Sequence, residues 1–218
     1  MIKVFKRPVP PSSLSNQNRY DTEEVKKQLL EDHQGKCYLC ERTLTTDFQV
    51  EHLHSQEHFP QEKYHWDNLF LACSYCNSKK GSLFDQILHP SQEAIETLIL
   101  QQLDYSKKEA IFATTMANPS EETQQTISLL NRIFNGSHRI RKIKEERFFE
   151  EFLSKMNTFQ RAINHFLTCD TGEARLILEE ELAKDSEFLG FKYWIIQRNP
   201  KLAKEFAQNI LWNKTSIK

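Results

Sequence analysis

Glycine is scarce in this chain, and its scarcity limits the folds that the chain can adopt. Only 5 of the 218 residues are glycine, against an average usage of about 7%. Because tight β-turns rely on positive φ angles that glycine adopts most readily, an all-β fold with many turns is disfavoured. The sequence also contains no G-x-G-x-x-G and no G-x-x-x-x-G-K-[ST]. A Rossmann fingerprint and a Walker A phosphate loop are therefore excluded.

An excess of one charge and a long apolar run are also missing. The chain has 29 Lys+Arg and 30 Asp+Glu, for a formal charge of -1, which argues against coating nucleic acid or membrane by bulk charge but leaves room for a local basic site. No stretch approaches the ~18 apolar residues of a transmembrane helix, and MIKVFKRPVPPSSL has no run typical of a signal peptide. We expect a cytoplasmic protein with no membrane partner and reduced cysteines.

Composition shifts along the chain predict three segments. Residues 1–19 form an extended, basic and proline-rich arm, residues 20–90 a small domain that holds most of the cysteines and histidines, and residues 91–218 an all-helical C-terminal domain. The fold class that we predict is α+β, mainly α. In the small domain we expect a helix from Asp21 or Thr22 to about His33, two strands within 44–53, and a helix from near Cys76 past Phe84. In the last segment the apolar spacing predicts helices over 91–103, 105–116, 120–134, 138–168, 173–183, 186–197 and 201–211.

Four of the five cysteines form two C-x-x-C pairs that are separated by 32 residues, namely Cys37, Cys40, Cys73 and Cys76. Each pair can present two thiolates from one tight turn, and two pairs complete a tetrahedral zinc site. A closed site of this kind has no open position for a substrate, so we expect the zinc to stabilise the fold. Cys169 is remote from the pairs, and we expect it in the core.

Polar residues between and after the two pairs add a second signal. The segment runs through Val50-Glu51-His52, then Asn68-Leu69, then Cys73-Ser-Tyr-Cys76-Asn77-Ser-Lys79-Lys80. It resembles the HNH endonuclease family, whose ββα-metal motif reads C-x-x-C, [DE]-H, N-L and C-x-x-C-[HN]-x-x-K. The resemblance covers roughly residues 37–81 and implies a zinc-stapled HNH domain within 20–90.

The resemblance implies a role for each residue of the motif. His52 would be the general base that deprotonates water, since the imidazole pKa suits that task near neutral pH. Glu51 and Asn77 would offer oxygen ligands to a catalytic Mg²⁺ or Mn²⁺, and Asn68 would pin the loop that orients His52. Adjacent strand residues point to opposite faces, so a strand end or bulge must aim the Glu51–His52 pair. Lys79 and Lys80 would contact phosphates.

Three further side chains near the motif have less specific readings. His54 and His58 are histidines that the motif does not require. We interpret them as polar loop residues or as residues that support the site. If they were metal ligands, they would indicate a softer metal. Trp66 offers a ring on which a base could stack, but packing against the zinc knuckle is the favoured interpretation.

The order of the motifs and the basic opening also narrow the resemblance. They look like the HNH subunit of Septu-type anti-phage systems, a family (PtuB) that some retron operons also carry. Membership would imply an ABC/SMC-like ATPase partner (PtuA), sometimes a retron reverse transcriptase with its DNA–RNA hybrid, and a nucleic acid substrate, DNA first. Because the chain has no Walker motif, any dependence on ATP would come from the partner.

Charge is unevenly distributed in the last segment. Residues 131–147 hold six Lys/Arg against two Glu, and residues 173–187 hold six Asp/Glu against two Lys/Arg. We hypothesise that the first stretch guides nucleic acid and that the second docks on a partner; two solvated helix faces are the alternative. Two other functions stay open: an HNH ribonuclease that acts on RNA such as tRNA, and a non-catalytic zinc-ribbon adaptor that binds nucleic acid or protein.

Overall fold

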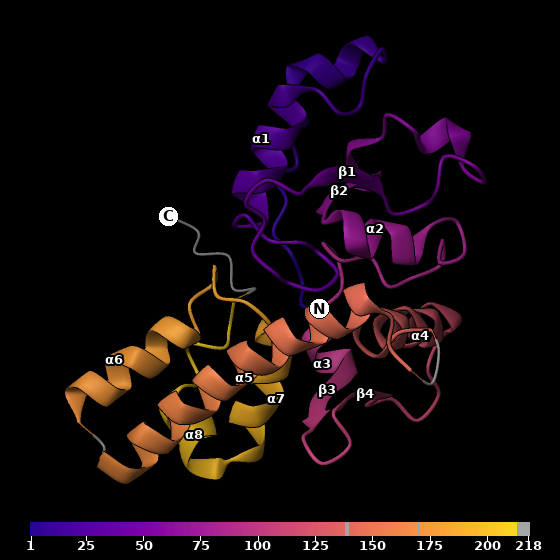
Figure 1. Cartoon of the computed structure of the whole chain (residues 1–218). Helices are drawn as coiled ribbons and strands as arrows, with labels where there is room; N and C mark the ends of the chain where they lie inside the picture. The colour runs from indigo at the N-terminus through magenta and orange to yellow at the C-terminus, as the bar shows by residue number, and fades with distance from the viewer. Residues whose placement is uncertain (138–139, 170, 213–218) are drawn as a thin grey trace.

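The computed structural model describes residues 1–137, 140–169 and 171–212 and places their elements in two groups (Figure 1). The first group contains α1 (Glu23–Asp32), β1 (Gln49–His52), β2 (Leu69–Ala72) and α2 (Ser74–Lys80), with 3-10 turns at Ser12–Asn16, Pro60–Glu62 and Trp66–Asn68. The second contains α3 (Ile95–Leu98), β3 (Ile99–Asp104), β4 (Glu109–Thr114), α4 (Glu121–Asn135), α5 (Ile143–Cys169), α6 (Gly172–Glu181), α7 (Leu189–Arg198) and α8 (Pro200–Glu205). The predicted class, α+β and mainly α, is confirmed.

Across the part of the chain that the structure describes, no helix combines the length and the apolar character needed to cross a membrane.

Helix α1 begins where the sequence predicts. The side chain of Thr22 accepts a hydrogen bond from the backbone N–H of Val25 at 3.3 Å, which satisfies one of the free donors of the first turn. Glu23 and Glu24 follow at the positive end of the helix dipole. Val25 and Leu29 are buried, so the narrow apolar stripe turns α1 toward β2.

The small sheet differs from the predicted one. We expected two strands within 44–53, joined near Thr46–Asp47, but β1 pairs antiparallel with β2, and Gln49 lies opposite Ala72 and His52 opposite Leu69. All four residues of β2 are buried, which makes it the better partner for a strand that needs cover. The prediction of a local hairpin is wrong because the buried strand β2, although distant in the sequence, covers β1.

Helix α2 is shorter than predicted and starts at the second cysteine pair. Its N-cap is Cys73, whose sulfur accepts a hydrogen bond from the N–H of Cys76 at 3.4 Å. The helix ends at Lys80 because Gly81 adopts φ 51°, a left-handed value that glycine tolerates. The predicted continuation past Phe84 is therefore wrong.

A β-hairpin replaces the two helices predicted over 91–103 and 105–116. Strands β3 and β4 pair with Ile99 opposite Thr114 and Asp104 opposite Glu109. Burial alternates along β3 with the period of two that a half-buried strand requires. The turn carries no glycine: Oδ1 of Asp104 accepts the N–H groups of Ser106 and Lys107, and Lys108 takes the positive φ of 53°. The C-terminal segment is therefore not all-helical.

The remaining predicted helices are present with shifted ends. The segments 120–134, 138–168, 173–183 and 186–197 correspond to α4, α5, α6 and α7, and the segment 201–211 is helical only as far as Glu205 in α8. His138 and Arg139, where the α5 prediction starts, lie outside the described residues. Phenylalanines of α4, α5 and α7 pack ring against ring, with centroids of Phe152 and Phe191 4.6 Å apart. The phenylalanines of these helices thus form a packed core.

Polar contacts connect the two groups across the predicted boundary at residue 90. The ammonium of Lys36 donates to the carbonyls of Lys184 and Ser186 at 2.6 and 2.7 Å. Arg42 forms an ion pair with Glu151 of α5 at 3.0 Å, and the buried Glu41 accepts the N–H of Gly190 at 3.1 Å. The second group therefore provides much of the cover of the cysteine-bearing part.

Candidate functional site

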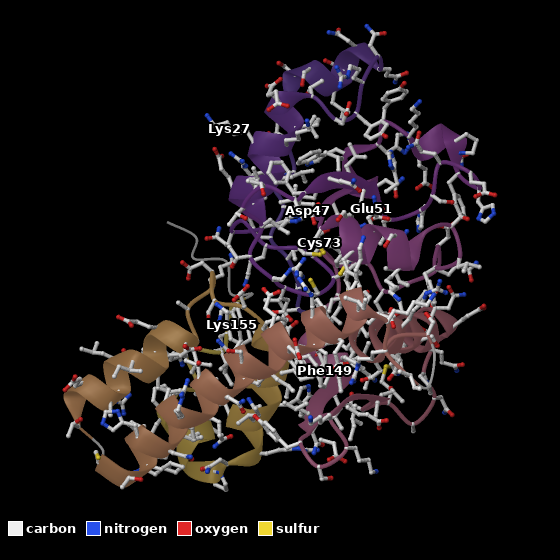
Figure 2. The ribbon with its side chains drawn as sticks, in the orientation of Figure 1. Lys27, Asp47, Glu51, Cys73, Phe149 and Lys155 are labelled. Carbon is white, nitrogen blue, oxygen red and sulfur yellow. The ribbon has the colours of Figure 1, made fainter. Side chains whose placement is uncertain are left out.

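The four paired cysteines converge on one point at the start of α2. All four are buried, and one sulfur atom from each lies within 4.8 Å of the others. Figure 2 shows the sulfur atoms gathered at Cys73, close to Glu51. Four thiolates at Zn–S distances of about 2.3 Å would occupy such a cluster. The residues thus fit the predicted zinc ion, with donors of the type that zinc prefers.

The surroundings of this cluster favour negative charge on sulfur. Hydrogen bonds from the other three thiols, Cys37 first, hold the pKa of Cys73 well below its ordinary value, whereas burial raises the pKa of Cys40 and Cys76. Arg42 lies nearby. Its burial alone would lower its pKa, but the sulfurs of Cys40 and Cys73 and the carboxylate of Glu151 raise it overall. A fixed cation thus stands beside thiols that a bound metal would deprotonate.

Glu51 lies on the face of β1 that packs on α2, and its carboxylate is fully engaged. Tyr38 donates its hydroxyl to Oε2 at 2.6 Å, and the ammonium of Lys80 lies 2.9 Å from Oε1. Lys80 is completely buried; it also donates to the backbone carbonyl of His52 at 2.9 Å and lies 3.8 Å from Asp85. Burial raises the pKa of Glu51, and Lys80 and Tyr38 oppose that rise.

This arrangement does not fit a divalent cation on Glu51, since the ammonium of Lys80 already occupies the position of a cation. It also removes Lys80 from the surface, where the sequence places it as a phosphate contact. Lys79, its neighbour, forms an ion pair with the buried Glu145 of α5. Neither lysine of the motif is free in this structure.

His52 has a different set of partners from Glu51, as the alternation of strand side chains requires. Its Nε2 lies 2.9 Å from the carbonyl oxygen of Lys63, which can only accept, so Nε2 carries the proton. Nδ1 is then the acceptor, and the amide of Gln56 donates to it at 3.3 Å. Tyr20 packs edge-on against the ring with centroids 4.5 Å apart. Burial lowers the pKa of His52, which favours the neutral ring.

Asn68 fixes the loop between β1 and β2 from both sides of its amide. Its Oδ1 accepts the N–H of His54 at 2.7 Å, while Nδ2 donates to the carbonyls of His54 and Glu62 at 3.0 and 3.2 Å. These bonds hold the loop that contains Lys63, whose carbonyl orients His52. The contacts have the form that the proposed role of Asn68 requires.

The two surplus histidines pair with carboxylates of the same region. Nδ1 of His54 lies 2.7 Å from Glu62, and Nδ1 of His58 lies 2.6 Å from Asp85. Asp85 also accepts the N–H and the hydroxyl of Ser55. Although burial raises the pKa of Asp85, these hydrogen bonds bring it below the ordinary value. Within the described residues the cysteines form the only group of three or more potential ligands close enough for one metal ion.

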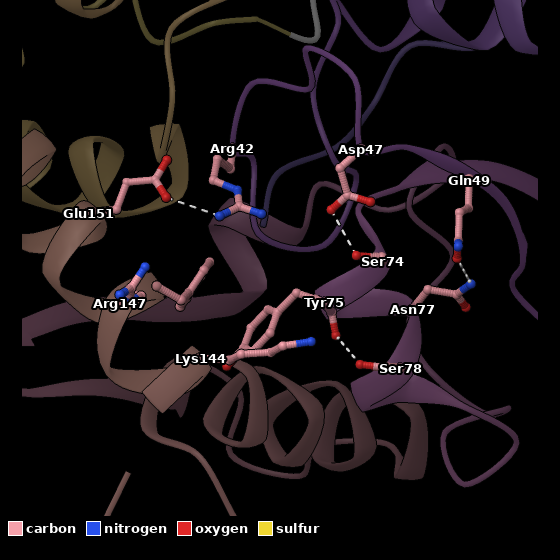
Figure 3. A pocket seen from close by; sticks show the side chains of 11 residues that line it. Arg42, Asp47, Gln49, Ser74, Tyr75, Asn77, Ser78, Lys144, Arg147 and Glu151 are labelled. Carbon is pink, nitrogen blue, oxygen red and sulfur yellow. Dashed lines mark hydrogen bonds and ion pairs between the residues drawn. The ribbon is translucent and has the colours of Figure 1, made fainter. Parts of the chain in front are cut away.

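Asn77 lies apart from His52, on the wall of a cavity of about 680 Å³ between α2 and α5 (Figure 3). Its amide donates to Oε1 of Gln49 at 2.6 Å. The cavity is lined by Arg42, Asp47, Gln49, Ser74, Tyr75, Asn77, Ser78, Lys144, Arg147, Phe148 and Glu151. Of the residues that the sequence assigns to the site, this cavity therefore takes in Asn77, while Glu51 and His52 lie outside its lining.

The sequence missed two members of the site and misplaced a third residue. Tyr38 and Asp85 contact the motif through folding alone, although the position of Tyr38 inside the first C-x-x-C pair was an available signal. Trp66 is buried, with its indole N–H donated to the carbonyl of Arg7 at 2.7 Å, so its ring belongs to the core, while packing against the zinc knuckle stays a prediction. Cys169 is exposed at the end of α5. The prediction that it belongs to the core is wrong, because the apolar face of α5 passes through Phe166 instead.

Two comparisons with known proteins bear on this region. The HNH endonuclease family matches residues 37–83. The Septu protein PtuB of Bacillus thuringiensis is 33% identical over 94 aligned residues, which cover 36% of this chain and 37% of that protein. The chain thus matches little more than a third of the length of this relative. Residues 37–83, with the four cysteines, Glu51, His52, Asn68 and Asn77, form an HNH endonuclease domain.

Proposed function

We propose that this protein is an endonuclease that hydrolyses phosphodiester bonds of nucleic acid, DNA in the first place, with His52 as the general base. The observation that carries the proposal is the tautomer of His52 within a matched HNH domain. Because Nε2–H is held by the carbonyl of Lys63, the lone pair lies on Nδ1, which accepts a proton from water once the long 3.3 Å contact with the Gln56 amide is given up. The lowered pKa of His52 supports the same role.

The reaction is a hydrolysis that consumes one water. Nδ1 of His52 takes a proton from this water, the oxygen attacks phosphorus, and the bond to the departing oxygen breaks. The departing oxygen then acquires a proton from solvent. Asn68 contributes by fixing the loop that carries Lys63, and therefore acts on the orientation of His52 without touching the substrate.

The catalytic metal remains part of the proposal. The resemblance implies Mg²⁺ or Mn²⁺, and Glu51 and Asn77 carry oxygen donors of the type that such ions bind. The ammonium of Lys80 lies at 2.9 Å from Glu51, however, so a cation on that carboxylate requires Lys80 to give way. His54 and His58 are engaged with Glu62 and Asp85, which supports their interpretation as supporting residues.

A plasmid-nicking assay tests the general base. Zinc-loaded protein would be incubated with supercoiled plasmid and Mg²⁺ or Mn²⁺, alone and with a co-expressed ATPase. We expect His52→Ala to lower the rate by about 10²–10⁴-fold, the usual contribution of a general base. The matched control is His165→Ala, which removes an exposed imidazole of α5. Equal nicking by wild type and His52→Ala would remove His52 from the reaction.

The same assay separates the alternatives. Cleavage of tRNA or other RNA without cleavage of DNA would identify a ribonuclease, since the motif handles phosphate and does not read the 2′-hydroxyl. Absence of cleavage of both polymers would favour the zinc-ribbon adaptor. Release of phosphate from ATP and scission of the nucleic acid strand should both be measured with the protein alone as well. The proposed dependence on ATP would come from the partner, so the protein alone should release no phosphate from ATP.

We further propose that the protein works in the cytoplasm as the effector subunit of an anti-phage complex. The partial similarity to a Septu protein supports this assignment, and an ABC/SMC-like ATPase (PtuA) is the partner it suggests. A retron reverse transcriptase with its DNA–RNA hybrid is a further proposed partner. Three carboxylates of the acidic stretch, Glu179, Glu181 and Glu187, already pair with cations of the chain. Failure of a co-expressed ATPase to co-purify would remove this assignment.

A further inference from the structure

In the structure, neither lysine of the motif is available for contact with a phosphate. The ammonium of Lys80 is buried on Glu51, and that of Lys79 is paired with Glu145. A nuclease still has to hold a polyanion beside its site, and phosphate contacts supply most of that affinity. The replacement must come from cations that lie outside the motif and face the same helix.

Helix α5 places three such cations opposite α2. Lys142, Lys144 and Arg147 are exposed at the start of α5, and none of them has an ion pair among the described residues. By contrast, the two carboxylates of α5 that line the cavities are already paired, Glu145 with Lys79 and Glu151 with Arg42. The unmatched charge on this wall is therefore positive.

The three cations border one continuous groove. Lys144 and Arg147 line the 680 Å³ cavity that reaches Asn77. A second cavity of about 600 Å³ shares Tyr75, Ser78 and Lys144 with the first and is bordered by Lys142. In Figure 3 the side chain of Lys144 extends from α5 past Tyr75 into the space in front of Ser78. The groove thus runs from the start of α5 to the point where α2 meets β1.

The position of these cations is unfavourable for α5 itself. Lys144 and Arg147 lie near the start of α5 and Lys142 directly precedes it, so all three are at the positive end of the helix dipole, where a cation is destabilising. Repulsion among the three adds to that cost. Glu145 and Glu146 lie in the same turn and oppose part of this cost, but Glu145 is already paired with Lys79. A polyanion in the groove would offset the remaining repulsion.

The groove offers no free aromatic face for a base. The Tyr75 ring is stacked on Phe148 with centroids 4.8 Å apart, and the ammonium of Lys79 lies 5.6 Å from its centroid. Its hydroxyl is donated to the carbonyl of Ile133. Stacking of bases on the groove is therefore disfavoured, and its unpaired cations favour contacts with the charged backbone of the ligand.

We propose that this groove between α2 and α5 holds the phosphate backbone of the nucleic acid strand, with Lys142, Lys144 and Arg147 as its contacts. The proposal rests on the proposed nuclease function and specifies how its substrate is held. It gives the basic stretch 131–147 a role through these three residues, while Arg139 of that stretch lies outside the described residues.

The salt dependence of binding tests the groove without relying on cleavage. Affinity of the zinc-loaded full chain for a fluorescein-labelled 25-bp duplex would be measured from 50 to 200 mM NaCl, without Mg²⁺ or Mn²⁺. Each phosphate contact contributes about -0.9 to the slope of log K against log salt. Lys144→Gln/Arg147→Gln should therefore reduce the slope by about 1.8 and weaken binding, equally for duplexes of unrelated sequence.

The matched control removes the same charge elsewhere. Lys27→Gln/Lys204→Gln changes two exposed lysines, on α1 and α8, that form no ion pair in the described part, and it should keep the wild-type slope. The groove proposal would be overturned by any of three results: an unchanged salt slope in the groove variant, an equal loss of slope in the control variant, or no binding by the wild type. If the slopes follow the prediction but the wild type cuts neither DNA nor RNA, the nuclease proposal fails and the groove stands.

Discussion

At the scale of single residues, the type of a motif residue predicts its chemistry better than it predicts where its side chain lies in the fold. Lys79 and Lys80 are adjacent and look equivalent in the sequence, but successive helix positions differ by about 100° in direction. Lys79 therefore faces Glu145 of α5, whereas Lys80 is buried against Glu51. The roles predicted for His52 and Asn68 stay predictions, and short local loops supply the hydrogen-bond partners of both side chains. The partners Tyr38 and Asp85 could not be read from the motif, because only folding brings them to Glu51 and Lys80.

The buried pair of Lys80 and Glu51 leads to a prediction for stability. Lys80→Ala leaves Glu51 buried without its cation, and such a loss typically costs about 3–5 kcal/mol of the free energy of unfolding. Urea denaturation in excess zinc would measure it, with the exposed Lys27→Ala as the control at about 0–0.5 kcal/mol. The double variant Lys80→Met/Glu51→Leu should recover much of the loss. A cost for Lys80→Ala below about 1 kcal/mol would contradict the buried pair.

The same contact changes which variant best probes the metal. Glu51→Ala would remove a proposed ligand and also leave Lys80 buried and unpaired, so loss of activity would mix two causes. Asn77 is only half-buried and its amide bonds Gln49. Asn77→Ala is therefore the cleaner variant for the role of the metal.

At the scale of elements, the sequence predicted best where a local signal dominates. The caps Thr22 and Ser120 start α1 and α4 as expected, because a hydroxyl three residues before an N–H suffices. The hairpin β3–β4 escaped prediction because its turn uses Asp104 and Lys108 in place of glycine. Pairing of β1 with β2 escaped as well, since it joins residues about 20 positions apart across the loop 53–68.

Cysteine substitutions test the zinc cluster as a structural element. Cys37→Ala or Cys73→Ala should abolish the single zinc per chain and unfold the region around α2, because zinc binding and folding are coupled at structural sites. Zinc content by mass spectrometry and thermal melting would measure both effects. Cys169→Ala provides the control, since that thiol is exposed and distant from the cluster. Retention of zinc and of the wild-type melt by Cys37→Ala would show that the four thiols do not form the site.

At the scale of the whole molecule, the neutral total charge conceals how the two groups of elements are joined. The sequence divides the chain at 19 and 90, and that division stays a prediction. Several contacts across it use buried charged side chains, as with Glu41 on Gly190 and Lys36 on Lys184 and Ser186. Composition does not reveal such contacts, because a buried lysine and a solvated one contribute equally to the sum.

The burial of Lys36 at this interface makes the stability of the protein depend on pH. Burial lowers its pKa from 10.5 to about 8, so between these values the unfolded chain binds more protons than the folded one. Stability should then rise with pH from about 8 to 10.5, and the full cost of burying the charge applies below pH 8. A difference of about 2.5 pKa units corresponds to at most about 3–4 kcal/mol. Lys36→Met should flatten this part of the curve of unfolding free energy against pH, measured by urea denaturation at fixed excess zinc. Lys27→Met should leave it unchanged, and parallel curves for wild type and Lys36→Met would show that Lys36 keeps an ordinary pKa at the interface.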